Sequence, residues 1–433
     1  MSVTLAPLAT APMRAYIGNE DPFLFRRART WWLLLALFLA AQGNGIFTLP
    51  NRPGKDLQSL SQYTDYSKTN LFWLTALMCV ICLGLLVKRI GPTLRLMLKQ
   101  KAVLAFAVLA FLSTLWSQNP EFTFRKAALL FLSFSFAWYF ATSYSPEDQM
   151  RLLLAAGVIV AMASIAMVVL LPQYGLDAGG EWKGVFGQKN PFGHAIVFLF
   201  SGLAFRRSSS KRRLLTIAFQ AILPIGLIIL SRSKGSLILA FLLIAVRVYG
   251  PVVKHARKYE LPFLLYVSVI GALVIAMGRG IILSLLGRDS TLSGRTEEWA
   301  VLTPYALRHF WLGYGYQAFW TDQDSLHAMR AIGAAIHGAD SGYMDTLLQF
   351  GLAGMCLWVI LLWVSMRNIL AVFRRASVPL PAYWYTGLIL VTFVGSFTEG
   401  MFPGSTGLDT FSLVLACAGL KNVAAGAESP NHV

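Results

Sequence analysis

Long apolar runs separated by short polar segments dominate the chain. A helix needs about 20 apolar residues to cross the hydrocarbon core of a bilayer, or somewhat fewer when flanking polar side chains reach the interface. By this criterion the pattern predicts an all-α polytopic membrane protein with about twelve transmembrane helices. The predicted spans are residues 31–50, 70–87, 102–116, 127–144, 151–171, 192–205, 213–231, 235–250, 261–279, 344–366, 383–398 and 405–420.

One long polar stretch interrupts these spans between the ninth and the tenth. It runs from Arg279 to Tyr343 and holds most of the residues that could do chemistry. A helix is expected to begin near Arg295, because Glu297 and Glu298 would then lie in its first turn, where the helix dipole favours acidic side chains. The stretch therefore predicts a large, partly helical cap over a site at the membrane surface.

The end of the polar stretch predicts a second helix and a helix cap. Thr321 can start a helix that runs to about Ala335, and Asp340 or Ser341 can cap the helix of the tenth span. These boundaries divide the chain into an N-terminal transmembrane bundle (1–279), a cap loop (280–342), C-terminal transmembrane helices (343–421) and a tail with the composition of a disordered segment (422–433).

Composition and charge support this topology. Hydrophobic residues make up 56% of the chain, and the mean hydropathy is +0.59, which a soluble domain rarely approaches. The net charge of +17 does not indicate nucleic acid, because the basic residues form short clusters between apolar runs. With Arg26, Arg27 and Arg29 in the cytoplasm before the first span, the whole net charge falls on the predicted cytoplasmic side. We therefore predict that both termini lie in the cytoplasm and the cap outside.

The interiors of the predicted spans hold almost no ionisable groups. Proton- or ion-coupled transporters usually carry acids or histidines near the midplane of the bilayer, so their absence favours chemistry at the outer interface. Cys79 and Cys82 match a CxxC spacing, but they lie inside an apolar run, where redox or zinc chemistry is unfavourable. The pattern therefore predicts no metal site.

Four motif-like stretches all fall on the predicted outer side. They are Trp182-Lys-Gly-Val-Phe-Gly-Gln-Lys-Asn190, Ser231-Arg-Ser-Lys-Gly235, Ser293-Gly-Arg-Thr-Glu-Glu-Trp299 and His337-Gly-Ala-Asp-Ser-Gly-Tyr343. In this order they resemble motifs of the O-antigen ligase / polysaccharide polymerase superfamily of bacterial inner-membrane proteins, and most closely those of exopolysaccharide repeat-unit polymerases.

The resemblance implies a GT-C-like fold and a glycosyltransferase that needs no cofactor. Such an enzyme moves a glycan from an undecaprenyl-diphosphate carrier to an acceptor hydroxyl on the periplasmic side of the inner membrane. The implied partners are the lipid-linked donor, a glycan or lipid-glycan acceptor, membrane lipid and, as a further candidate, a regulator of chain length. The family typically has His-Asn-x-Tyr where this chain has Asp340-Ser341, and the nearest imidazole is that of His337. Either His337 or Asp340 could therefore be the catalytic base.

The chemistry of a lipid diphosphate leaving group assigns roles to the remaining motif residues. Cations must meet the charge that builds on the departing oxygen, and a single displacement would invert the anomeric carbon. We assign Arg295 to the diphosphate, with Lys234 or Arg232 as its partner, because arginine forms bidentate contacts and lysine acts as a point charge. Lys189 and Asn190 could contact phosphate or sugar.

Each assignment has a purely structural alternative. Arg295 could pair with Glu297 or Glu298, and Lys234 could be a lysine that reaches the interface from the end of a span. Asp340 could be a helix cap, and a turn would explain Lys189 equally well. The aromatic residues of the cap suit sugar stacking or an interfacial aromatic belt; they are Trp299, Tyr305, Trp311, Tyr314, Tyr316 and Trp320.

Three functions remain open at this level. A polymerase would join repeat units, whereas an O-antigen ligase would transfer a finished glycan to lipid A-core or another acceptor, and both need the same diphosphate site. The stretch from Gly184 to Asn190 favours the polymerase. A transporter of lipid-linked oligosaccharide would need two similar halves, and the sequence shows no internal repeat.

Overall fold

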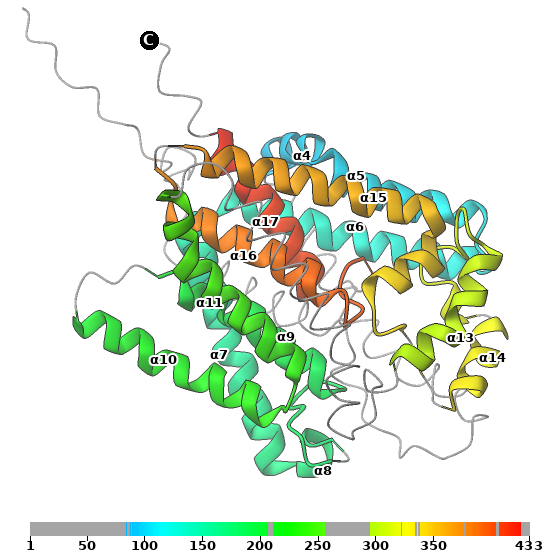
Figure 1. Cartoon of the computed structure of the whole chain (residues 1–433), viewed down its shortest axis with the longest axis horizontal. Coiled ribbons are helices and arrows are strands. Elements are labelled where there is room, and N and C mark those ends of the chain that lie inside the picture. Colours follow the sequence, from blue (N-terminus) through cyan, green and yellow to red (C-terminus); the bar gives the residue numbers. More distant parts are fainter. Residues whose placement is uncertain are drawn as a thin grey trace, which may run out of the picture.

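The computed structural model describes most of the chain beyond residue 88. The described residues are 89–177, 179–206, 211–255, 295–321, 323–333, 338–375, 377–403 and 407–425, together with Gly84, Val87 and Ile336. Within these ranges the regular structure is helical, and Leu176 and Trp182 form an isolated β-bridge (Figure 1). The prediction of an all-α protein is therefore confirmed for this part of the chain.

A helix covers each predicted span that lies within the described residues. The predicted spans 31–50 and 261–279, and nearly all of 70–87, lie outside them. The elements are α4 (Ile90–Lys99), α5 (Lys101–Leu112), the 3-10 helix η2 (Ser113–Leu115), α6 (Pro120–Ser143), α7 (Pro146–Leu170), α8 (Pro172–Gly175), α9 (Lys189–Ala204), α10 (Lys211–Leu230), α11 (Lys234–His255), α13 (Arg295–Arg308), the 3-10 helix η3 (Phe319–Thr321), α14 (Gln323–Ile332), α15 (Gly342–Phe373), α16 (Leu380–Gly395) and α17 (Leu408–Ala425).

Several of these helices are compatible with a membrane. By length and apolar composition, α7 and α15 could each cross a bilayer, and so could α4 and α5–η2 if this pair, bent by 94°, is one span. On α10 an apolar stripe runs from Leu215 through Phe219 and Ile222 to Ile229, and each of these side chains is more than half exposed. Such a surface is typical of lipid contact rather than of water. The count of twelve spans stays a prediction.

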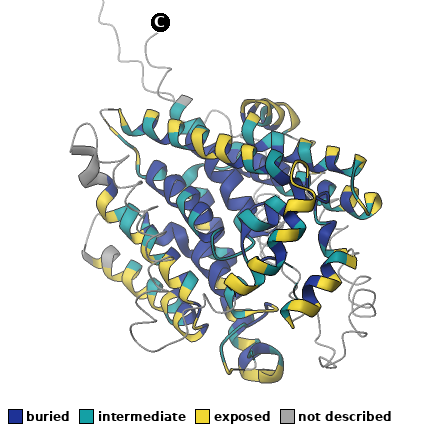
Figure 2. Ribbon diagram, turned by 45° about the vertical axis from the view of Figure 1, so that its right-hand side comes forward, coloured by how far each residue is buried: buried dark blue, intermediate teal, exposed yellow. Residues whose placement is uncertain are grey.

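The core of the bundle lies where α9, α16 and α17 pack between the other helices. Figure 2 shows the buried residues concentrated in this interior. Buried polar pairs connect the helices: Trp384 of α16 donates from Nε1 to Ser201 Oγ of α9 at 2.9 Å. Its neighbour Tyr385 donates to Gln149 Oε1 of α7 at 2.7 Å. A buried polar group is tolerated when it has such a partner, so these bonds favour one packing register.

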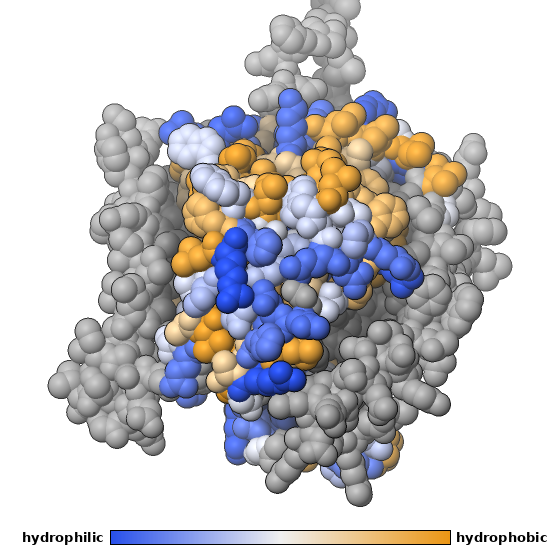
Figure 3. Space-filling model, turned by 90° about the vertical axis from the view of Figure 1, so that its right-hand side faces the viewer, coloured by the Kyte–Doolittle hydropathy of each residue, from blue (hydrophilic) through white to orange (hydrophobic). Residues whose placement is uncertain are grey.

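The two predicted cap helices are present as α13 and α14, at one end of the bundle (Figure 1). They share a small core with the start of α15, which consists of Leu302, Ala306, Tyr314, Phe319, Ala328, Ala339 and Leu348. Figure 3 looks onto this end of the molecule, where hydrophilic side chains gather across the middle of the face. The cap is thus packed against α15.

A glycine turn attaches the cap to α15. Tyr314 N–H donates to Leu348 O at 2.8 Å, and Gly315 N–H donates to Gln349 O at 3.0 Å. Gly313 has φ +65°, and a Cβ there would lie 2.4 Å from the carbonyl carbon of Gln349. Only glycine combines this backbone conformation with so close an approach. This turn fixes the cap against α15.

Candidate functional site

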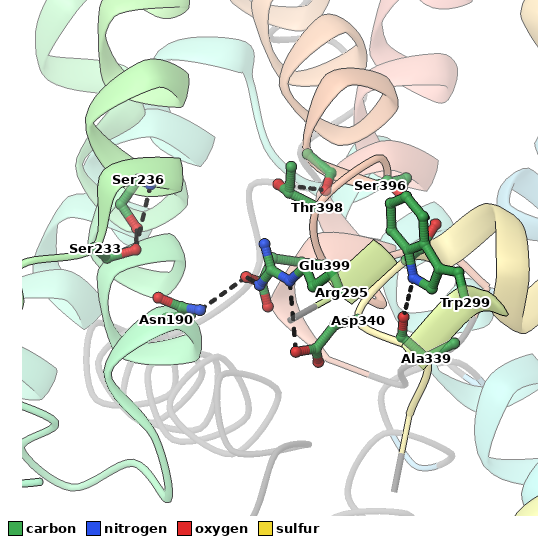
Figure 4. Close-up of polar contacts among 12 residues, drawn as sticks. Asn190, Ser233, Ser236, Arg295, Trp299, Ala339, Asp340, Ser396, Thr398 and Glu399 are labelled. Atoms are coloured by element: carbon green, nitrogen blue, oxygen red, sulfur yellow. Dashed lines mark hydrogen bonds and ion pairs between the residues drawn. The ribbon is translucent and has the colours of Figure 1, made fainter. Parts of the chain in front are cut away.

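Arg295, the first residue of α13, is the centre of a partly buried polar cluster (Figure 4). Its Nη2 donates to Glu399 Oε1 at 2.5 Å, and its Nε lies 3.6 Å from Asp340 Oδ2. The arginine side chain is 15% exposed. A charge so withdrawn from water needs partners, and both recorded partners come from other elements of the chain. The alternative pairing with Glu297 or Glu298 is not the one observed.

Glu399 connects the arginine to a third element. It lies in the turn that follows α16, and its Oε1 also accepts a hydrogen bond from Asn190 Nδ2 of α9 at 2.9 Å. Figure 4 shows Asn190 reaching toward Glu399 from one side and Arg295 from the other. Sequence analysis missed Glu399. The available signal was an isolated carboxylate directly after a predicted span, on the same predicted side as the four motif stretches.

The carboxyl groups around Arg295 are perturbed by burial. Burial raises the pKa of Glu399 to about 7, although the charge of Arg295 and the hydrogen bonds from Arg295 and Asn190 act in the opposite direction. Burial also raises the pKa of Glu298, and the negative charge of Asp340 raises it further. Near neutral pH Glu399 therefore exchanges its proton more readily than an ordinary carboxylate.

Asp340 is not a helix cap. Ser341 takes that role, because its side chain accepts from Met344 N–H at 3.4 Å. Asp340 instead has φ +45°, in the left-handed region that few residues other than glycine adopt. Two bonds hold the preceding residue: Trp299 Nε1 donates to Ala339 O at 2.8 Å, and Ala339 N–H donates to Asp345 Oδ1 at 3.1 Å. These bonds therefore hold the backbone in place where Asp340 meets Arg295. Backbone conformations of this uncommon kind occur often at functional sites.

A second charged cluster lies at the start of α9. Lys189 Nζ donates to Glu181 Oε1 at 3.1 Å. The hydrogen bond from Lys189 lowers the pKa of Glu181, and the charge of Arg232 lowers it further. Arg232 is exposed and has φ +50°, and Lys234 is exposed at the first position of α11. Lys189 is adjacent in sequence to Asn190, so this cluster borders the one around Arg295.

A close helix contact brings these stretches together. A Cβ at Gly193 of α9 would lie 2.3 Å from Ser236 Oγ and 2.9 Å from Ser236 Cβ on α11. Ser236 Oγ in turn donates to Ser233 Oγ at 2.8 Å. The segment around 189–193 therefore lies directly beside the start of α11. Contacts between described residues of all four motif stretches thus converge at one end of the bundle.

Three residues of the motif stretches lie outside the described residues: His337, Ser293 and Gly294. No contact between Arg295 and Arg232 or Lys234 is recorded among the described residues, so their partnership stays a prediction.

The buried aromatic residues of the cap have structural contacts. Tyr314 and Tyr316 are each 1% exposed, which leaves no ring face for a sugar. Their hydroxyls donate to Asp324 Oδ2 and Pro403 O, both at 2.9 Å. Trp311 is 70% exposed, so it keeps the alternatives of sugar stacking and interfacial contact.

A cleft opens beside Glu399, between α9 and the start of α17. It is lined by Pro191, His194, Phe198, Glu399 and Asp409, among others. His194 is 7% exposed, and its Nε2 is buried without a hydrogen-bond partner among the described residues. The arrangement thus combines a guanidinium, a buried carboxyl group and a cleft that a small polar ligand could enter.

Comparison with known proteins identifies one family. Residues 219–359 match the model of a family described as O-antigen ligase. The matched segment runs from α10 into α15 and includes Arg232, Lys234, Arg295 and Asp340. Asn190 and Glu399, which contact each other, lie on either side of it. No curated protein matches the chain. The match of residues 219–359 supports the O-antigen ligase / polysaccharide polymerase superfamily, which the four sequence stretches resemble.

Proposed function

We propose that this protein is an inner-membrane glycosyltransferase that polymerises undecaprenyl-diphosphate-linked repeat units on the periplasmic side. The observation that carries the proposal is the position of Arg295. Within the segment that matches the O-antigen ligase family, this arginine is buried between Glu399 and Asp340, which belong to other elements. A guanidinium so fixed before substrate binds is suited to electrostatic stabilisation of a leaving group.

The cations at the neighbouring stretches would complete the diphosphate site. The single positive charge of Arg295 is offset by the carboxyl groups of Asp340 and Glu399, so Arg295 without other cations gives no excess of positive charge. Lys189, Arg232 and Lys234 supply positive charge at the adjacent starts of α9 and α11. We therefore place the diphosphate between Arg295 and these cations, away from Asp340. Arginine and lysine would meet the charge of the leaving oxygen, which makes a metal unnecessary.

The reaction we propose is a single displacement with inversion at the anomeric carbon. It needs a base that takes the proton of the acceptor hydroxyl. The sequence offers His337 and Asp340 for this role, and the structure adds Glu399. The charge pattern of the chain supports the orientation, because the cytoplasmic termini and basic clusters lie on the side opposite to the motif stretches in the predicted topology.

The second candidate function is that of an O-antigen ligase proper, which the description of the matched family favours. Deletion of the gene followed by glycan analysis separates the two. Loss of long polymer with accumulation of single repeats supports the polymerase. Full-length chains stranded on the lipid carrier would support the ligase.

Purified variants test the enzyme itself. With a lipid-diphosphate glycan as substrate, Arg295→Ala is expected to lower the rate of chain lengthening by about 100-fold or more, because an oriented donor to the leaving group is lost. The matched control is Arg308→Ala at the other end of α13, where the arginine is exposed and pairs with Asp324; its rate should stay within about twofold of wild type. If Arg295→Ala lengthens chains at the wild-type rate, the proposed function is wrong.

A further inference from the structure

We infer that Glu399 is the catalytic base that takes the proton of the acceptor hydroxyl, and that the cleft beside it receives the acceptor sugar. This inference rests on the proposed glycosyltransferase function. It assigns to Glu399, in the turn after α16, the task that the sequence left open between His337 and Asp340.

The contacts of Glu399 leave one oxygen for the substrate. Both recorded hydrogen bonds, from Arg295 Nη2 and from Asn190 Nδ2, go to Oε1. Among the described residues no bond to Oε2 is recorded. The carboxyl plane is therefore fixed through one oxygen, while the other is available to a ligand in the cleft that Glu399 lines. A general base must lie within hydrogen-bond distance of the proton that it takes, and a carboxylate oxygen at the cleft could do so for an acceptor hydroxyl.

Both polar and apolar side chains form the wall of this cleft. His194 is part of the wall, but its Nε2 is closed to solvent and lies beside α11, where a Cβ at Gly235 would be 3.4 Å away. Pro191 and Phe198 also line the cleft and are apolar. The carboxyl group of Glu399 next to these apolar residues suits a ligand that has both hydroxyl groups and an apolar face.

Burial distinguishes Glu399 from Asp340. The Glu399 side chain is 14% exposed, whereas that of Asp340 is 50% exposed. Arg295 of α13 and Asn190 of α9 donate to Glu399, and the charge of Asp340 acts on it from the segment before α15. His194 of α9 and Asp409 of α17 line the same cleft. Burial and the charge of Asp340 raise the pKa of Glu399 to about 7, against the lowering effect of Arg295. A base of that strength is well matched to neutral pH, and an ordinary glutamate would be a weaker one.

In the proposed step one bond forms and one breaks at the anomeric carbon, and one proton moves to Glu399. The acceptor oxygen forms a bond to the anomeric carbon as the bond from that carbon to the diphosphate oxygen breaks. The bonding electron pair leaves with the diphosphate, whose charge meets Arg295. The hydroxyl proton passes to the Glu399 carboxylate, which later releases it to water. Arg295 thus contacts both the base and the leaving group, so that the two charges that change are adjacent.

The test uses the full-length purified protein with a lipid-diphosphate glycan. Glu399→Gln keeps an oxygen that can accept from Arg295 and Asn190, but it cannot take a proton. We expect the kcat to fall by about 100-fold or more, with the KM for the donor within about threefold of wild type. The wild-type rate should rise with pH and level off above about 7, because the ionised form is active. This acid limb should disappear in Glu399→Gln and persist in the less active Glu399→Asp.

The controls separate this inference from the proposed function and from a folding defect. Glu121→Gln makes the same change at an exposed glutamate that pairs with Arg125 on α6, and its rate should match wild type. Activity of Glu399→Asp shows that position 399 tolerates a change. A Glu399→Gln enzyme with near wild-type kcat, an unchanged acid limb, or an equal loss of donor affinity would overturn the assignment of the base. Only activity of Arg295→Ala would overturn the proposed function as well.

Discussion

Arg295 makes contacts that a lysine could not reproduce. Its Nη2 reaches Glu399 and its Nε faces Asp340, so two edges of one planar group connect two different elements. An ammonium group is a compact point charge and lacks this fork. We therefore expect two roles for this arginine. It would contact the diphosphate of the donor, and it holds the carboxylate of Glu399 in place beside the cleft.

Asn190 tunes the same carboxylate from the opposite side. Its Nδ2 hydrogen bond to Glu399 stabilises the ionised form and so lowers the pKa of Glu399. Asn190→Ala removes this contribution, and the pKa of Glu399 should rise. The acid limb of the pH–rate profile should therefore move to higher pH, with a several-fold loss of rate at neutral pH and a smaller loss in alkaline buffer. A shift to lower pH would contradict the contact.

Two residues of the site could be predicted from the sequence, and Glu399 could not. Arg295 and Asp340 were predicted from motifs, because the residue types and their order carry the chemistry. Glu399 was not, since its contacts join positions that are 104 and 209 residues apart in the chain. Its position directly after a predicted span was the one local signal, and that signal does not identify its partners. It becomes visible only when the packing of α9, α13 and α16 is known.

At the scale of elements, the site depends on how closely α9 approaches α11. Gly193 allows this approach, because any larger residue would meet both Oγ and Cβ of Ser236. The contact sets Asn190, one turn earlier on α9, at its distance from Glu399. The helices themselves need no glycine here, and in isolation an alanine would favour α9.

This difference gives a matched pair of variants. Gly193→Ala should force the two helices apart, cost about 1–3 kcal/mol of stability and lower the rate of chain lengthening at least tenfold. Gly226→Ala in α10 is the control, since a Cβ there meets nothing within 4 Å. Thermal unfolding in detergent and the lengthening assay would measure both effects. Equal behaviour of the two variants would mean that the α9–α11 contact does not position the site.

Element existence was predictable from the sequence, but element ends were less so. The apolar runs predicted spans at 127–144 and 151–171, whereas α6 begins at Pro120 and α7 at Pro146. Capping explains the difference: Asn119 accepts from Phe122 N–H at 3.3 Å, and Ser145 accepts from Asp148 N–H at 3.2 Å. A proline follows each cap at the first helical position, where it fits without loss. The helices therefore begin before the apolar runs, α6 by nearly two turns and α7 by about one and a half.

At the scale of the whole molecule, the polar cluster lies at one end of an apolar bundle. The starts of α9, α11, α13 and α15 and the turn after α16 all contribute to that end (Figure 1). Exposed apolar side chains follow α10, whereas hydrophilic side chains gather across the middle of the face that the cap presents (Figure 3). This difference suits an enzyme whose donor has a lipid tail in the bilayer and a sugar above it. The alternation of basic loops predicts that the cap lies outside the cytoplasm, and this orientation stays a prediction.

Direct binding of the lipid-linked donor tests the central claim, that the cluster around Arg295 holds a lipid diphosphate. The measurement is a titration of the purified protein with undecaprenyl-diphosphate glycan, without acceptor. The account predicts that Arg295→Ala weakens binding by about tenfold or more, as expected for the loss of a charge-assisted pair, while Arg308→Ala binds as wild type does. Equal affinities of wild type and Arg295→Ala would contradict it.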